Sequence, residues 1–205
     1  MTHLARVERR DLCTTLLRVG PDAPTLCTGW TTRDLAAHLV VRERRPDAVL
    51  GLVLPALAGR TERLQADQAR TEWAELVALL RSGPPTWSPS RLPPLDDAAN
   101  TAELFVHHED VLRAQPGWRP RLVEPRLQHA LWGACGVVGR LALRVAPVGV
   151  ELVAPGHGRV TARRADPGVR VEGPPAELLL FAFGRRSVAQ VQLDGSPDAV
   201  RQLTG

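Results

Sequence analysis

The side chains of this chain that are best suited to chemistry are two histidines and a glutamate, in segments with helical apolar spacing. Glu103 and His107 are four residues apart, so on a helix they project from the same face. Leu104 and Val111 border that face, which indicates that it points inward, where a carboxylate is costly unless it is paired. His38 lies among apolar residues of another segment. Two imidazoles and one carboxylate that meet in a helical core form a three-ligand site for a divalent metal ion, with a position left for water or substrate.

The same residues have other interpretations at this level. A histidine such as His38 on an apolar helix is also typical of a hydrogen-bonded core residue, and a glutamate–histidine pair four residues apart is common as an ion pair on a solvated face. Imidazole and carboxylate ligands suit zinc, and they also suit nickel or iron. Asp110 follows His107 by three residues, so its carboxylate can accept a hydrogen bond from a ligand histidine and fix the ring. We therefore take Asp110 as a candidate catalytic residue.

The elements that must position these residues are predicted to be helical up to about residue 146. Apolar spacing predicts helices over residues 2–19, 60–82, 96–114 and 125–144. A further helix begins after the N-cap Thr31, with Asp34 completing a capping box, and ends at Pro46. A proline-rich connection over residues 82–94 precedes the helix that carries Glu103.

After about residue 147 the pattern changes to short strands and short helices. The strands are predicted over residues 148–154, 159–162, 169–172 and 191–193, and the helices over 174–183 and 197–203. The sequence therefore predicts a helical domain over residues 1–146 and a small α+β domain over residues 147–205.

Composition limits the class of partner. The 205-residue chain has a net charge of +4 and a pI of about 10.0. All 26 basic residues are arginine, which a GC-rich coding sequence supplies, and acidic residues are interspersed among them. We therefore expect no nucleic-acid partner. Because there is neither an apolar run of about 20 residues nor a signal peptide, we expect no membrane association and a cytoplasmic protein, as a monomer or homodimer.

The three cysteines are Cys13, Cys27 and Cys135, an odd number that are far apart in the sequence. This spacing argues against a disulfide framework and against a cysteine-based zinc site. Cys13 and Cys135 lie among apolar residues, as small buried side chains do. None of the three is placed to act as a covalent nucleophile.

Three segments resemble those of a known family. Residues 26–39, which include Gly29, Trp30 and His38, resemble the opening motif of the mycothiol-dependent maleylpyruvate isomerase family, part of the wider DinB-like metal-binding bundles. Residues 100–110 resemble the second metal motif of that family, and residues 173–185 resemble its C-terminal domain. The resemblance covers nearly the whole chain in the right order. It is strongest for a branch of uncharacterised metal-binding proteins.

The resemblance implies a DinB-like helical bundle followed by a sterol-carrier-like α+β domain, with a zinc site made of His38, Glu103 and His107. Characterised members use the low-molecular-weight thiol mycothiol to isomerise a cis double bond or to transfer the thiol. Mycothiol as cosubstrate and a small electrophilic substrate are therefore implied here. The isomerases also use a catalytic arginine, for which Arg42, one turn after His38, is on the right face. Further arginine candidates are Arg45, Arg113 and Arg185.

In a thiol mechanism the metal lowers the pKa of the bound thiol, the thiolate attacks an electrophilic carbon, and an arginine anchors a carboxylate. Two other functions use the same ligands. A metal-dependent hydrolase would activate water with a general base, for which Asp110 and Glu43 are candidates. A non-enzymatic protein would bind the metal and hold a small apolar ligand in its C-terminal domain.

Overall fold

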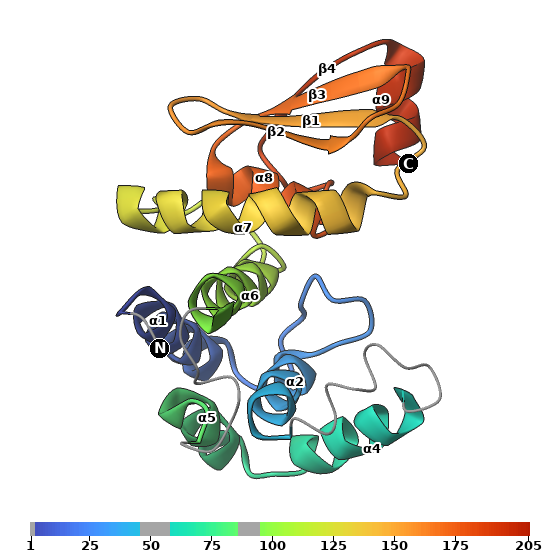
Figure 1. Ribbon diagram of the computed structural model, residues 1–205. Helices are drawn as coiled ribbons and strands as arrows, with labels where there is room; N and C mark the ends of the chain where they lie inside the picture. The colour runs from blue at the N-terminus through green and yellow to red at the C-terminus, as the bar shows by residue number, and fades with distance from the viewer. Residues whose placement is uncertain (1–2, 46–57, 86–94) are drawn as a thin grey trace. The chain divides into compact units, whose positions relative to one another are not determined.

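The computed structural model describes residues 3–45, 58–85 and 95–205, and the chain divides into two units, Met1–Pro120 and Arg121–Gly205 (Figure 1). The described part is of mixed α and β class, with helices first and a four-stranded sheet in the second unit. None of the described helices combines the length and the apolar character that a membrane span requires. The predicted connection over residues 82–94 lies mostly outside the described residues, as do residues 46–57.

The described residues of the first unit form helices packed around an apolar core. The helices are α1 (His3–Val19), α2 (Thr32–Arg44), α4 (Ala58–Ala69), α5 (Trp73–Ser82) and α6 (Leu95–Leu112). Helix α1 packs against α5 and α6, and α2 packs against α4 and α5. The core between them is made of buried aliphatic side chains, among them Leu12, Leu35, Leu39, Leu76 and Leu104. Helices α2 and α6, which carry the candidate ligands, both contribute to this core.

The start of α2 is set by the predicted capping box. The backbone N–H of Thr31 donates to Oδ2 of Asp34 at 2.9 Å, and the Asp34 N–H donates back to the Thr31 hydroxyl at 3.4 Å. These bonds satisfy amides that the first turn of a helix leaves without partners. The cap fixes where α2 begins and so which face His38 occupies.

The predicted helix over residues 60–82 is wrong in one respect, because two helices, α4 and α5, replace it. Glu72 forms the break: its backbone is non-helical and its carboxylate accepts the Glu75 N–H at 3.0 Å as an N-cap. Arg33 of α2 donates to the carbonyls of Ala69 and Thr71 at 3.1 and 2.9 Å, so the carbonyls at the end of α4 find partners outside their own helix. Apolar periodicity continues across the break and does not reveal it.

The second unit contains helix α7 (Pro125–Leu143), strands β1 (Gly149–Ala154), β2 (Gly158–Arg163) and β3 (Gly168–Glu172), helix α8 (Pro175–Ala182), strand β4 (Gln192–Asp194) and helix α9 (Pro197–Thr204). The sheet order is β2-β1-β3-β4, with β1 and β3 parallel and the other pairs antiparallel. Helices α7 and α8 lie on one face of the sheet (Figure 1). The predicted succession of strands and helices after residue 147 is confirmed.

The division between the units differs from the predicted boundary between residues 146 and 147. Helix α7 packs against α8 and β2, and the backbone of Gly139 approaches the Leu152 side chain so closely that a Cβ there would lie 2.8 Å from it. The side chain of Gln128 also accepts the N–H of Ala176 at 2.9 Å. The helix over residues 125–143 therefore belongs with the sheet, and the division falls between residues 120 and 121.

Candidate metal centre

The structure brings His38, Glu103 and His107 together between α2 and α6. The Nε2 atom of His38 lies 3.8 Å from Oε1 of Glu103, and Nε2 of His107 lies 4.0 Å from the same oxygen. One ligand atom from each residue lies within 4.8 Å of the other two. The side chains keep 17%, 21% and 12% of their surface exposed, in that order, so the cluster is sheltered but reachable from solvent.

The two oxygens of Glu103 have different partners. Oε1 faces the two imidazoles, whereas Oε2 forms an ion pair with Nη2 of Arg42. The other terminal nitrogen of Arg42 donates to Oδ1 of Asn100 at 2.7 Å. Arg42 is therefore held at the cluster by the carboxylate oxygen that does not face the histidines.

The charge of Glu103 is stabilised in place. Burial opposes ionisation of this carboxyl, but the neighbouring His38 and the charge of Arg42, together with His107, outweigh burial and lower its pKa below the usual value. Glu103 is consequently a carboxylate over the physiological pH range, as a metal ligand must be.

Asp110 orients His107. Its Oδ2 atom lies 3.0 Å from Nδ1 of His107, and its side chain is fully buried. A carboxylate next to Nδ1 holds the proton on that nitrogen, which leaves the Nε2 lone pair directed toward Glu103. Sequence spacing suggested this contact, and the structure contains it.

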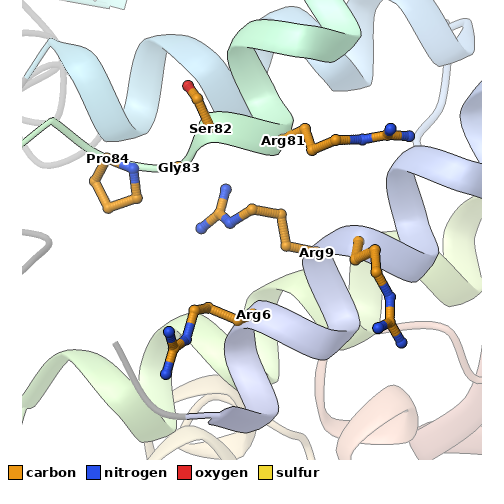
Figure 2. A pocket seen from close by; sticks show the side chains of 7 residues that line it. Arg6, Arg9, Arg81, Ser82, Gly83 and Pro84 are labelled. Atoms are coloured by element: carbon orange, nitrogen blue, oxygen red, sulfur yellow. The ribbon is translucent and has the colours of Figure 1, made fainter.

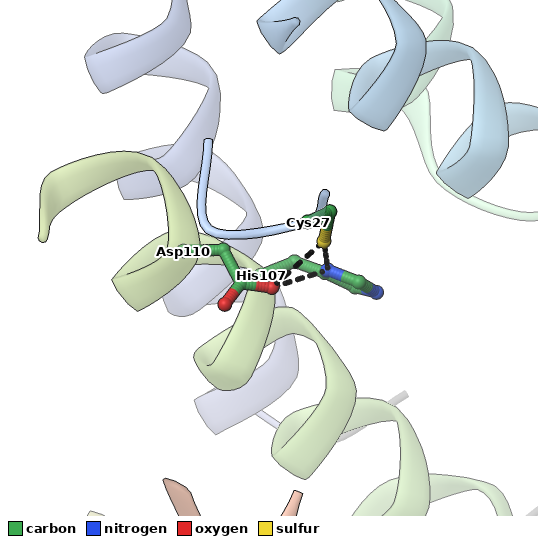
Figure 3. A group of neighbouring side chains, drawn as sticks. All are labelled: Cys27, His107 and Asp110. Carbon is green, nitrogen blue, oxygen red and sulfur yellow. Dashed lines mark hydrogen bonds and ion pairs between the residues drawn. The ribbon is translucent and has the colours of Figure 1, made fainter. Parts of the chain in front are cut away.

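Sequence reasoning missed a contribution from Cys27, in the loop before α2. Its thiol donates to Oδ2 of Asp110 at 3.2 Å, and Sγ lies 4.0 Å from Nδ1 of His107 (Figure 3). The loop is fixed there because the Leu26 N–H donates to the Asp110 carbonyl at 3.0 Å. No spacing rule connects residue 27 to residue 110, so only the fold reveals this neighbour.

Aromatic rings border the other side of the cluster. The ring of Trp30 lies 5.0 Å from the His38 ring, and the His38 and His107 rings are 5.5 Å apart in an edge-to-face arrangement. Trp30 also packs against the apolar core of the helices. The Trp30 ring therefore limits the freedom of His38 to turn away from Glu103.

The donor set fits a divalent ion. Two ligand atoms of one tetrahedral zinc ion lie roughly 3.3–3.6 Å apart, given bond lengths of about 2.0–2.3 Å. The separations of 3.8 and 4.0 Å at Glu103 are only a few tenths of an ångström wider, a difference that small side-chain rotations remove. Two imidazoles, one carboxylate and an oriented Nε2 lone pair match a site with a free position for a further ligand.

Other candidates from the sequence have structural partners elsewhere. Arg113, the residue after α6, donates to Glu109 at 2.6 Å in a buried pair. Arg185 lies in the second unit, where it donates to the Phe183 carbonyl. Glu43, a candidate base, is buried and bonded to Arg9.

A separate cavity of about 340 Å³ lies near Arg9 (Figure 2). Arg6 and Arg9 of α1 line it together with Arg81 at the end of α5. The guanidinium of Arg9 donates hydrogen bonds to the carboxylate of Glu43 and, at 3.1 Å, to the carbonyl of Leu80. The carboxylate oxygens of Glu43 therefore accept from Arg9 in this ion pair and do not serve the metal cluster.

Comparison with known proteins agrees with the resemblance noted in the sequence. No family model and no curated protein matches the chain. Two solved structures do: a histidine-to-alanine mutant of the mycothiol-dependent maleylpyruvate isomerase, with a TM-score of 0.62, and the mycothiol-dependent maleylpyruvate isomerase itself, with a TM-score of 0.59. Each is 18% identical in sequence, and each match covers 93% of this chain and 90% of the other. The resemblance is thereby confirmed at the level of the fold.

Proposed function

We propose that this chain, which has the fold of the mycothiol-dependent maleylpyruvate isomerase, is a metal-dependent enzyme that uses a low-molecular-weight thiol. The metal ligands are His38, Glu103 and His107, and zinc is the ion that suits this donor set most simply. The observation that carries the proposal is the approach of both histidine Nε2 atoms to one oxygen of Glu103, at 3.8 and 4.0 Å.

The residues of the chain have separable roles in this proposal. A divalent ion in the cluster supplies Lewis acidity, which lowers the pKa of a thiol so that the thiolate forms near neutral pH. Asp110 holds the proton of His107 on Nδ1 and so keeps Nε2 available as a ligand. Arg42 keeps Glu103 ionised and placed, and its guanidinium lies beside the cluster, where it can pair with an anionic group of the substrate.

The thiol we propose is mycothiol, because the two solved structures that share the fold are of a mycothiol-dependent isomerase. Its thiolate adds to an electrophilic carbon of a small substrate. In isomerisation, the adduct rotates about the bond that has become single and then expels the thiolate. In transfer, the carbon–sulfur bond is kept, and the carbanion left by the addition takes up one proton, which balances the proton lost by the thiol. We further propose that the first unit is a DinB-like bundle and that the second is a sterol-carrier-like domain.

A hydrolase that uses the same ligands is less well supported. It needs a general base beside the metal-bound water. Glu43 is buried in its pair with Arg9, and Asp110 lies at the Nδ1 edge of His107, on the opposite side of the ring from Glu103. Neither candidate base from the sequence is therefore placed for that reaction.

Two measurements test the proposal. Elemental analysis of protein purified without chelators should find about one divalent ion per chain, and His38→Ala should lose it. Titration calorimetry of the zinc-loaded protein with mycothiol should show binding that His38→Ala abolishes and that the exposed second-unit variant His129→Ala retains. Metal-free protein, or turnover of esters and amides without thiol binding, would refute the proposal. Metal without any thiol binding or turnover would favour the non-enzymatic function.

A further inference from the structure

A second group of metal-binding donors meets on the other edge of His107. Cys27 Sγ, His107 Nδ1 and Asp110 Oδ2 come from the loop before α2 and from α6 (Figure 3). Their separations are 3.2 Å between sulfur and oxygen, 3.0 Å between nitrogen and oxygen and 4.0 Å between sulfur and nitrogen. All three differ by about half an ångström or less from the roughly 3.3–3.6 Å expected for ligands of one tetrahedral zinc ion.

We propose that Cys27, His107 and Asp110 form a second metal position, which takes a thiophilic divalent ion such as Cd²⁺ or excess Zn²⁺. Binding releases one proton, that of the Cys27 thiol, and shifts the proton of the neutral His107 ring from Nδ1 to Nε2. In the metal-free protein the same contacts are hydrogen bonds to Asp110. This position shares His107 with the His38, Glu103 and His107 set but takes its other two ligands from outside that set, and it does not depend on the thiol reaction.

The two positions select different ions by charge and softness. A thiolate from Cys27 and the carboxylate of Asp110 together neutralise a divalent cation, and a thiolate favours soft ions. The first set has only one carboxylate, Glu103, and Arg42 lies beside it, so a dication there keeps a net positive charge. The Cys27 position accordingly favours thiophilic metals, whereas the His38 position favours an anionic further ligand.

The two positions share His107 and therefore compete. A neutral imidazole has one nitrogen lone pair, on Nε2 for the first position and on Nδ1 for the second. With a metal on Nδ1, the proton moves to Nε2, which faces Oε1 of Glu103 at 4.0 Å. Occupation of the Cys27 position thus removes a ligand from the first position, and a thiophilic ion inhibits any activity that the first position supports.

Cys27 is partly exposed, whereas the other two cysteines are buried. Cys13 and Cys135 are both fully buried, and burial raises the pKa of Cys13 to about 11 and that of Cys135 to about 12. Cys27 is half-buried. A metal-dependent change in thiol chemistry of the folded protein can therefore be assigned to Cys27.

The test is a titration of the metal-free full-length protein with Cd²⁺, followed by the ultraviolet absorption of the thiolate-to-cadmium charge-transfer band. We expect a saturable band in the wild type and in Cys13→Ser, and no band in Cys27→Ser. The alkylation of Cys27 by iodoacetamide, mapped by mass spectrometry, should slow by about tenfold or more when Cd²⁺ is present. His38→Ala should keep the band, because it leaves the three donors intact.

The outcomes separate this inference from the proposed function. A band in His38→Ala, together with failure of mycothiol to bind any form, would support the second position and refute the thiol function. No band in the folded wild type at saturating Cd²⁺, or a band that persists in Cys27→Ser, would overturn the second position. Asp110→Asn provides a further check: it should weaken Cd²⁺ binding while the thiol of Cys27 remains.

Discussion

Nδ1 of His107 lies 3.0 Å from the buried carboxylate of Asp110, and this contact fixes which ring nitrogen faces Glu103. The two residues are one helical turn apart on α6, so the helix itself sets their spacing. The backbone carbonyl of Asp110 also accepts the N–H of Leu26, which ties the loop that carries Cys27 to the same turn. One residue therefore orients the histidine and anchors the loop.

Asp110→Asn should weaken zinc binding by about 10- to 100-fold, because an amide in place of the carboxylate no longer holds the imidazole in one tautomer. Competition with a fluorescent zinc chelator measures this affinity. Asp67→Asn, at a largely exposed position, is the matched control and should have the wild-type affinity. Equal affinities in all three proteins would show that Asp110 does not act on the ligand His107.

Arg42→Met should destabilise the metal-free protein by about 1–2 kcal/mol, because the partly buried carboxylate of Glu103 loses its ion pair. Arg42→Lys should lower the free energy of unfolding by less, because it keeps the positive charge beside Glu103. Some loss should remain, because an ammonium group lacks the planar fork with which Arg42 also reaches Asn100. Chemical unfolding with and without zinc measures both effects. Zinc should recover much of the loss in Arg42→Met; an unchanged stability of the metal-free variant would contradict the role assigned to this arginine.

The core of the candidate site was accessible from the sequence because helical spacing is local information. Glu103, His107 and Asp110 share one helix, so their common face follows from 3.6 residues per turn. The pairing of that face with His38 depended on motif resemblance, since spacing does not specify which helices meet. Cys27 was missed because a loop residue has no periodicity, and its place depends on backbone bonds such as that from Leu26 to Asp110.

The errors in the fold have a similar origin. The break between α4 and α5 is made by a cap at Glu72 and by carbonyl contacts from Arg33, a residue distant in the sequence. The apolar spacing over residues 125–144 predicts a helix, and so groups α7 with the helices before it. The same spacing does not predict that this helix packs against α8 and β2. Element type is encoded locally, and the assignment of elements to units depends on contacts between distant residues.

Buried Cys13 gives the protein a pH dependence at alkaline pH. Burial raises the pKa of this thiol from 9.0 to about 11, against an opposing contribution from Arg81. Below pH 9.0 the thiol is protonated in both states; as the pH rises toward 11, the unfolded state loses the proton that the folded state keeps. The free energy of unfolding should therefore fall by about 2–3 kcal/mol over this window.

Urea unfolding at a series of pH values, compared between the wild type and Cys13→Ala, measures this contribution. The variant should lose less stability than the wild type over the same pH range, whatever its stability at neutral pH. Parallel curves for the two proteins would show that Cys13 does not titrate differently in the folded and unfolded states.

The buried pair between Arg9 of α1 and Glu43 of α2 gives a test of the packing that supports the site. Two contacts, of 2.5 and 2.7 Å, join the guanidinium to the two carboxylate oxygens, and burial raises the pKa of Glu43 against the opposing contribution of Arg9. Glu43→Leu alone should cost about 3–5 kcal/mol, because it leaves the charge of Arg9 buried without its carboxylate.

The double variant Arg9→Met/Glu43→Leu should recover most of that loss, since apolar side chains of similar volume replace both charges and remove the cost of desolvating them. Arg10→Ala, at the exposed pair with Asp11, is the control and should change the stability by less than about 1 kcal/mol. The measurement is urea unfolding of all four proteins at neutral pH. A double variant as unstable as Glu43→Leu would mean that α1 and α2 depend on the ion pair itself. If the recovered double variant still binds zinc, the Arg9–Glu43 pair supports the packing of α2 but is not required for metal binding at His38.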